Sequence, residues 1–234
     1  AWGTAFWSQT YHEWEEILPP RAALSARNPG QLLDFHRFSS DAVFAQYRAE
    51  AEVIRRLSDR PVTTNFMVTA HIENMDYWTW ADEMDIVAND HYLDHRLGDP
   101  LSELAFAADL SRGLSQGAPW ILMEHSTGAV NWQPLNLAKD PGQMLRNSLT
   151  HVARGADGVC FFQWRASLQG AEKFHSAMLP HAGTESRVFR EVVDLGAALG
   201  RLDEVQGSTV KADVAILWDF ESFWAQDLEW RPSE

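Results

Sequence analysis

The sequence predicts an α/β fold, namely the second half of a (β/α)8 TIM barrel, with strands five to eight and their helices. Short apolar runs alternate with helix patterns, an order typical of a parallel sheet. No glycine-rich phosphate loop follows any run, which disfavours a doubly wound nucleotide-binding sheet. Polar residues gather where the runs end, and barrel enzymes build their sites at that end.

Four apolar runs are the expected strands. Each is nearly continuous, as in strands that are buried on both faces. The runs are residues 62–69, 84–92, 120–124 and 158–164. Four units fill half of an eight-stranded barrel, and the opening residues 1–20 contain no such run. The sequence therefore predicts a barrel without its first four strands.

Capping signals place four helices among these runs. Ser39 or Ser40 is expected to cap the first, whose apolar stripe reaches Leu57. The second and third are expected to begin at Asp-Pro pairs, because proline suits the first helical position. These pairs lie at 99–100 and 140–141, and the fourth helix is expected over residues 184–199.

A fifth β-rich run, residues 214–218, lies beyond the last helix. It follows a turn at Gly207 and Ser208 and is expected to begin a second α/β domain. The predicted division is therefore residues 1–207 for the half barrel and residues 208–234 for the start of the second domain.

The charge balance excludes several classes of partner. Acidic residues outnumber basic ones by 33 to 19, for a net charge of −14. Such a chain repels phosphate backbones and anionic lipid, so we expect neither nucleic acid nor a membrane as partner. The one cysteine, Cys160, follows GADGV and is expected to be buried in a strand. One cysteine forms no internal disulfide and no multi-cysteine metal site.

The chain contains 11 tryptophans, many of them beside polar or acidic residues. A flat indole face suits the C–H face of a sugar ring, and neighbouring carboxylates could hold its hydroxyls. The alternative is that these side chains fill cores and interfaces. Composition alone favours the second interpretation.

Glu124 is the sharpest catalytic candidate. It directly follows the apolar run WILM, which places its carboxylate at the mouth of the expected sheet. Retaining glycosidases use two carboxyl groups about 5 Å apart, one as nucleophile and one as acid/base. The alternative role is a strand-end carboxylate that bonds only to nearby backbone or arginine.

Further candidates follow Glu124 along the chain. Trp132 is close enough in sequence to serve as a stacking platform. Glu172 and His175 are three residues apart and would share a face if their segment were helical. Glu-x-x-His also occurs in metal sites, but no further His or Cys cluster is nearby in sequence, so sugar binding is favoured over metal.

Five motifs resemble those of glycoside hydrolase family 42, the bacterial β-galactosidases. They span about residues 2–230 in the family's order. The motifs are GTAFWSQTYHEWEEILPPR, NPGQLLDFHRFSSD, NDHY, LMEHSTGAVNWQPLN and FFQWRASLQGAEKFHSAMLPH.

The resemblance implies a retaining β-galactosidase with Glu124 as nucleophile at the end of the seventh barrel strand. It also implies a cytoplasmic homotrimer, assembled through the second domain, with a galactoside as substrate and with no cofactor. No metal is expected in this chain. The residues that match the family's substrate-binding positions are Trp7, Tyr92, Trp132, Glu172 and His175.

The chain departs from the family pattern at the acid/base. The family places this glutamate in an Asn-Glu pair after the fourth strand, which would precede Ala1, and no such pair follows a strand here. We therefore expect the chain alone to be inactive. Two alternatives stay open: a β-glycosidase of the same fold on another sugar, such as an α-L-arabinopyranoside, and a non-catalytic carbohydrate-binding fragment.

Overall fold

The computed structural model describes residues 2–68, 74–94 and 100–228. The chain divides into two compact units, each described by itself below. The first comprises residues 1–60, 70–83 and 213–234, and the second comprises residues 61–69 and 84–212.

The second unit contains a parallel four-stranded sheet, as expected. Its strands pair in the order β1-β2-β3-β4, each with the next along the chain. A doubly wound sheet reverses its strand order, whereas a barrel keeps it, so this order agrees with part of a barrel. The bounds are Asn65–Phe66 for β1, Ala88–Asp90 for β2, Trp120–Glu124 for β3 and Ala156–Val159 for β4.

The last strand differs from its expected position. β4 begins two residues before the predicted run 158–164 and ends at Val159. Cys160 therefore lies just outside the strand and is exposed, so the prediction of a buried cysteine was wrong. β4 is the terminal strand of the described sheet and has a pairing partner on one side only, so its side chains are less covered than those of β3.

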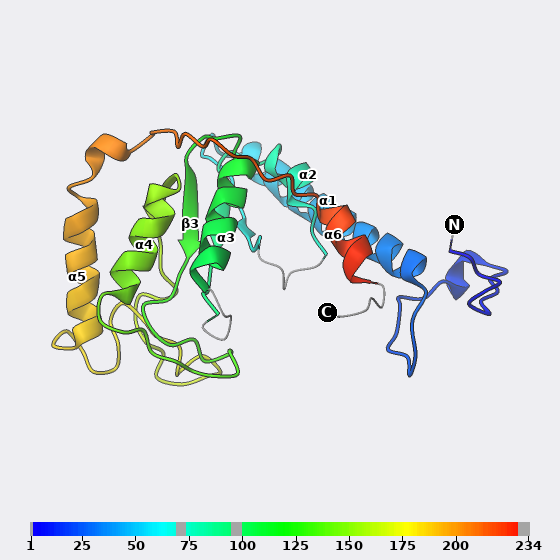
Figure 1. Cartoon of the computed structure of the whole chain (residues 1–234), viewed down its shortest axis with the longest axis horizontal. Helices are drawn as coiled ribbons and strands as arrows, with labels where there is room; N and C mark the ends of the chain where they lie inside the picture. The colour runs from blue at the N-terminus through cyan, green and yellow to red at the C-terminus, as the bar shows by residue number, and fades with distance from the viewer. Residues whose placement is uncertain (1, 69–73, 95–99, 229–234) are drawn as a thin grey trace. The chain divides into compact units, whose positions relative to one another are not determined.

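Three helices accompany this sheet (Figure 1). They are α3 (Pro100–Leu114), α4 (Gln143–Ala153) and α5 (Arg187–Leu199), with a short 3-10 helix, η2, at Asp203–Val205. α4 packs against β4 and against both other helices. The core between helices and sheet is fully buried at Leu104, Trp120, Leu122 and Met144.

The start of α4 lies later than the Asp-Pro signal indicated. Gly142 precedes the helix with a φ of +78°, a conformation that glycine adopts without strain. The side chain of Gln143 accepts a hydrogen bond from the backbone N–H of Asp140 at 2.8 Å. Asp140 and Pro141 therefore form a turn before the helix.

The first unit is built on a long helix, α1 (Pro29–Arg55), together with α2 (Tyr77–Ala81), α6 (Phe220–Asp227) and a 3-10 helix, η1 (Trp14–Glu16). The expected cap at Ser39 or Ser40 was wrong, because Asn28 caps α1 and its Oδ1 accepts from Gln31 N at 3.3 Å. Ser40 instead accepts from the backbone N–H of Asp76 at 2.9 Å.

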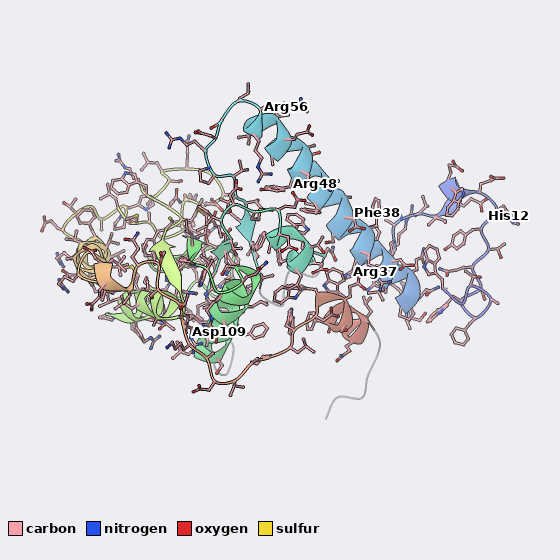
Figure 2. All side chains as sticks on the ribbon, turned by 90° about the horizontal axis from the view of Figure 1, so that it is seen from above. His12, Arg37, Phe38, Arg48, Arg56 and Asp109 are labelled. Carbon is pink, nitrogen blue, oxygen red and sulfur yellow. The ribbon has the colours of Figure 1, made fainter. Side chains whose placement is uncertain are left out.

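Aromatic packing holds α1 and α2 together. Trp80 of α2 is buried, and its ring stacks on Phe44 of α1 at 5.4 Å. Figure 2 shows α1 with Arg37 and Arg48 along its length. Arg37 bonds the carboxylate of Glu221 at 2.6 Å, which ties α6 to the same helix.

The fifth β-rich run, residues 214–218, does not form a strand. A strand needs a neighbour to satisfy its backbone groups, and the described sheet ends at β4. The side chains of Val214, Ile216 and Leu217 are accordingly exposed. In the described part of the chain, no helix has the length and apolar character needed to cross a membrane.

Candidate active site

Glu124 ends β3, on the side where the loops after β3 and β4 gather (Figure 1). Tyr92 follows β2 by two residues, and its Oη donates a hydrogen bond to Glu124 Oε2 at 2.6 Å. Asn65 of β1 lies on the other carboxylate oxygen, with its Nδ2 3.4 Å from Oε1. The carboxyl ends of three neighbouring parallel strands therefore meet at one carboxylate.

Asp90 is a second carboxyl beside Glu124. Its Oδ2 accepts a hydrogen bond from Asn65 Nδ2 at 3.0 Å, so Asn65 bridges the two carboxyl groups. Burial raises the pKa of Asp90 from 3.8 to about 7, and the charge of Glu124 adds to this, against the opposing hydrogen bond from Asn65. The uncharged form of Asp90 is thus favoured below about pH 7.

Tyr92 keeps its proton near neutral pH. Burial is the main cause that raises the pKa of Tyr92 above its usual value of 10, followed by the hydrogen bond to Glu124. A protonated phenol donates to a carboxylate in a charge-assisted bond, which is stronger than a neutral one. Tyr92 therefore fixes the direction of one oxygen of Glu124.

Aromatic rings surround this bond. The ring of Trp132 meets that of Tyr92 edge-on at 5.3 Å, and Trp132 is 50% exposed, so part of its face is open. The ring of His175 lies 5.9 Å from Tyr92 on an interplanar angle of 87°. His175 is buried, and its Nε2 has no hydrogen-bond partner among the described residues.

Glu172 and His175 flank a turn, not a helix as their spacing suggested. His175 N donates to Glu172 O at 2.9 Å, which closes the turn. Glu172 is exposed, and its charge contributes to the raised pKa of Tyr92, which places the two groups near each other. Asn131 donates to Ala171 O at 2.9 Å and joins this turn to the loop of Trp132.

Trp7 belongs to the first unit. Its ring packs edge-on against Phe6 at 5.1 Å, and the residue is half-buried. The expected contact of Trp7 with substrate stays a prediction.

Three buried histidines lie close together in the second unit, and two of them, His91 and His125, directly follow Asp90 and Glu124 in the sequence. The rings of His91 and His125 are 5.0 and 5.9 Å from that of His151. His125 Nδ1 donates to His91 O at 3.2 Å, and His91 Nε2 bonds Glu103 at 2.8 Å. Burial lowers the pKa of His125 and of His151 well below 6.5, so both are neutral.

The missed residues left different signals in the sequence. Asp90 is the last residue of β2 and belongs to the same NDHY motif as Tyr92, whereas Asn65 lies inside an apolar run with nothing to mark it. Within the described ranges, no group of three or more His, Cys, Asp or Glu side chains is placed to hold a metal ion. The geometry is that of a carboxylate held by two donors next to a partly open indole.

Comparison with known proteins identifies the family. The model of glycoside hydrolase family 42, described as β-galactosidase, matches residues 1–202. A β-galactosidase of Arthrobacter sp. is 58% identical over 234 residues, which are 100% of this chain and 34% of that protein. The β-galactosidase BbgII of Bifidobacterium bifidum is 49% identical over 240 residues, covering 100% of this chain and 35% of the relative.

Solved structures agree with the sequence relatives. The crystal structure of β-galactosidase from Bacillus circulans sp. alkalophilus matches with a TM-score of 0.89 and 42% identity, over 99% of this chain and 35% of that one. The chain thus spans about a third of the length of the relatives that it matches. Its four parallel strands correspond to part of their catalytic domain, and the chain belongs to glycoside hydrolase family 42, the β-galactosidase family.

Proposed function

We propose that the protein is a retaining β-galactosidase and that Glu124 is its nucleophile. The observation that carries this proposal is the carboxylate at the end of β3, with the Tyr92 hydroxyl on one oxygen and the Asn65 amide on the other. These two donors orient the carboxylate for attack. Galactose is proposed as the sugar because the relatives are β-galactosidases.

The reaction is a double displacement. Glu124 attacks the anomeric carbon, the glycosidic C–O bond breaks, and a second carboxyl group protonates the departing oxygen. Water, deprotonated by that second carboxylate, then attacks the glycosyl ester, releases Glu124 and restores the original anomeric configuration. The proton balance closes because the second group gives one proton and takes one back.

Five further side chains are assigned to the sugar. Trp132 stacks on the galactose ring with its open face, and Trp7 is assigned to the substrate through its match to the family's substrate-binding positions. Glu172 and His175 bind hydroxyl groups, and the buried Nε2 of His175, without a partner in the described residues, supports that role. Tyr92 orients Glu124 through its hydrogen bond and is also assigned to a hydroxyl group of the sugar. Contacts that tighten as the ring flattens toward an oxocarbenium ion raise the rate.

The second carboxyl group is proposed to come from a part of the protein beyond these 234 residues. The coverage of about a third of each relative supports this, as does the lack of an Asn-Glu pair after any of the four strands. In this proposal the strands are the fifth to the eighth of the barrel, residues 208–234 begin the trimerisation domain, and the whole protein is a cytoplasmic homotrimer.

A trapping experiment tests the role of Glu124. The protein at the full length of its relatives is incubated with a 2-deoxy-2-fluoro-galactoside that carries a good leaving group, and its intact mass is measured. We expect one covalent sugar, mapped to the peptide with Glu124, because the fluorine slows hydrolysis of the glycosyl ester.

Two variants make the result decisive. Glu124→Gln should remove both label and turnover, since an amide is a poor nucleophile. Glu185→Gln, at an exposed position before α5, should label like the native protein. A label elsewhere, or full activity in Glu124→Gln, would reject the assignment and leave a non-catalytic carbohydrate-binding role. The ratio of turnover on nitrophenyl galactoside and arabinopyranoside decides between the two sugars.

A further inference from the structure

Lys139 is a buried cation that the proposed mechanism does not use. The residue is 3% exposed, and its Nζ donates to Ser126 O at 2.6 Å, to Ser126 Oγ and to Gly128 O at 3.4 Å. An ammonium has three N–H donors, so these three acceptors satisfy it fully. No carboxylate in the described part of the chain offsets the charge, and burial lowers the pKa of Lys139 to about 7.

The acceptors of Lys139 lie directly after the proposed nucleophile. Ser126 and Gly128 follow Glu124 by two and four residues, so the bonds to Lys139 close residues 126–139 into a loop. This loop carries Trp132, the proposed stacking surface. The ammonium of Lys139, at one end of this loop, therefore holds the other end at residues 126–128 through hydrogen bonds.

The same turn is fastened on its other side to the turn of His175. Gly128 N donates to Ser176 Oγ at 2.9 Å, and Ser176 N donates to Ala129 O at 3.0 Å. A Cβ on Gly128 would lie 3.3 Å from that of Ser176, so the two segments are in close contact. A shift of the turn at Ser126 would therefore move both Trp132 and His175.

Lys139 also reaches the next helix through its backbone. Its carbonyl oxygen accepts a hydrogen bond from Arg187 Nη2 at 2.9 Å, and Arg187 is the first residue of α5. The far end of the loop is therefore anchored independently of the ammonium. Removal of the charge frees the turn at Ser126 while this anchor stays in place.

We propose that Lys139 is a positioning residue for the proposed glycosidase site, because its ammonium fixes the turn at residues 126–128 and thereby the loop that presents Trp132. The inference rests on the proposed function and deepens it. A buried charge is costly unless it is fully hydrogen-bonded, and here every bond goes to one short turn beside Glu124.

The test is a double-mutant cycle in the full-length protein. Lys139→Met keeps most of the unbranched side chain and removes the charge. It should lower kcat/KM about 10- to 100-fold, mainly through KM, because misplacement of a binding group by 1 Å can cost about 100-fold. Trp132→Ala should show a similar loss. If Lys139 acts through the loop of Trp132, the double variant should be within about twofold of Trp132→Ala alone.

Control variants distinguish the positioning role of Lys139 from the proposed glycosidase function. Lys211→Met, at an exposed position, should leave kcat/KM unchanged. If Lys139→Met fails to fold, Ser126→Ala replaces it in the cycle and should show a smaller loss with the same non-additivity. Losses that multiply, or full activity in a folded Lys139→Met, overturn the positioning role. Full activity in Glu124→Gln would instead overturn the proposed function.

Discussion

The bond between Tyr92 and Glu124 has a consequence for each step of the proposed double displacement. The phenol keeps its proton, so it donates to a charged oxygen before attack. When Glu124 forms an ester its oxygen loses charge, and the bond weakens. When water releases the carboxylate the charge returns, and the bond strengthens again. Tyr92 thus favours the second step while it orients Glu124 for the first.

Asp90 gives the stability of the protein an unusual pH dependence. Its pKa rises on folding from 3.8 to about 7, with burial as the main cause. The folded state holds the proton where the unfolded chain has lost it, so this contribution is full below about pH 4 and is lost as pH rises through about 7. Asp90→Asn does not titrate and so avoids this loss. Its free energy of unfolding should therefore rise relative to that of the native protein, by up to about 1 to 3 kcal/mol at the upper end of the range from pH 4 to 8.

Thermal unfolding of the native protein and of Asp90→Asn at about pH 5 and pH 8 measures this gain in stability. The difference in melting temperature should favour Asp90→Asn more at the higher pH, because only the native protein then carries the buried charge. Asp41→Asn, at an exposed position on α1, is the matched control and should show no such trend. An equal difference for Asp90→Asn at both pH values would contradict the raised pKa.

Individual residues were predictable where a strand end marked them. Glu124 stands at the end of an apolar run, whereas Tyr92 was singled out through the family resemblance. The parallel sheet brings the two into contact. Asn65 and Lys139 were not predictable, because their roles depend on pairing between strands and on closure of a loop. Neither relation is visible in local sequence.

Among the helices, α1 depends on one cap that also holds the start of the chain. Asn28 accepts from Gln31 N, and its Nδ2 donates to Trp2 O and Gln9 Oε1 at 2.8 and 2.7 Å. Asn28→Ala removes all three bonds and should lower stability by about 1 to 2 kcal/mol for the cap, with a further loss for the two donations. Urea unfolding followed by circular dichroism measures the loss.

A second substitution divides the effect of Asn28 into its parts. Asn28→Asp keeps the cap acceptor and loses the two donations, so its stability should fall between those of the native protein and Asn28→Ala. If both variants lose the same stability, the cap itself contributes nothing. Asp matches Asn in size, so the difference between Asn28→Asp and the native protein is free of a change in packing volume.

Helix and strand types followed from sequence better than their ends did. α3 begins at its predicted proline, Pro100. α1 begins at Pro29, because Asn28 is its cap and the proline its first residue, whereas the prediction placed the cap at Ser39 or Ser40. The run 214–218 has strong β propensity but no neighbouring strand, so propensity alone did not make it a strand. α2 and α6 are too short for a clear helical period.

For the whole molecule, we expect this chain alone to be catalytically incomplete. The 234-residue chain should hydrolyse nitrophenyl galactoside at a small fraction of the rate of a protein with the full length of the relatives, because we propose that the acid/base lies outside these residues. Purified samples of both, compared at equal concentration, measure the ratio. Comparable rates would show that the second carboxyl group lies within these residues.

An added nucleophile distinguishes a missing base from a missing site. Azide attacks a glycosyl ester without a general base, so it should restore turnover of a galactoside with an activated leaving group if the 234-residue chain forms the Glu124 site. The same chain with Glu124→Gln should not respond. No response in either would mean that the site needs the rest of the protein to form.

The exposed thiol of Cys160 is a natural attachment site for a spectroscopic label. It is the only cysteine in these 234 residues, it lies one residue beyond β4, and its backbone N–H bonds Leu122 O at 2.8 Å. A thiol-reactive spin label or dye would therefore attach at one position without prior mutation. That position is bonded to the strand that ends in Glu124, so the spectrum of the label would follow the pairing of β3 with β4 during unfolding or assembly.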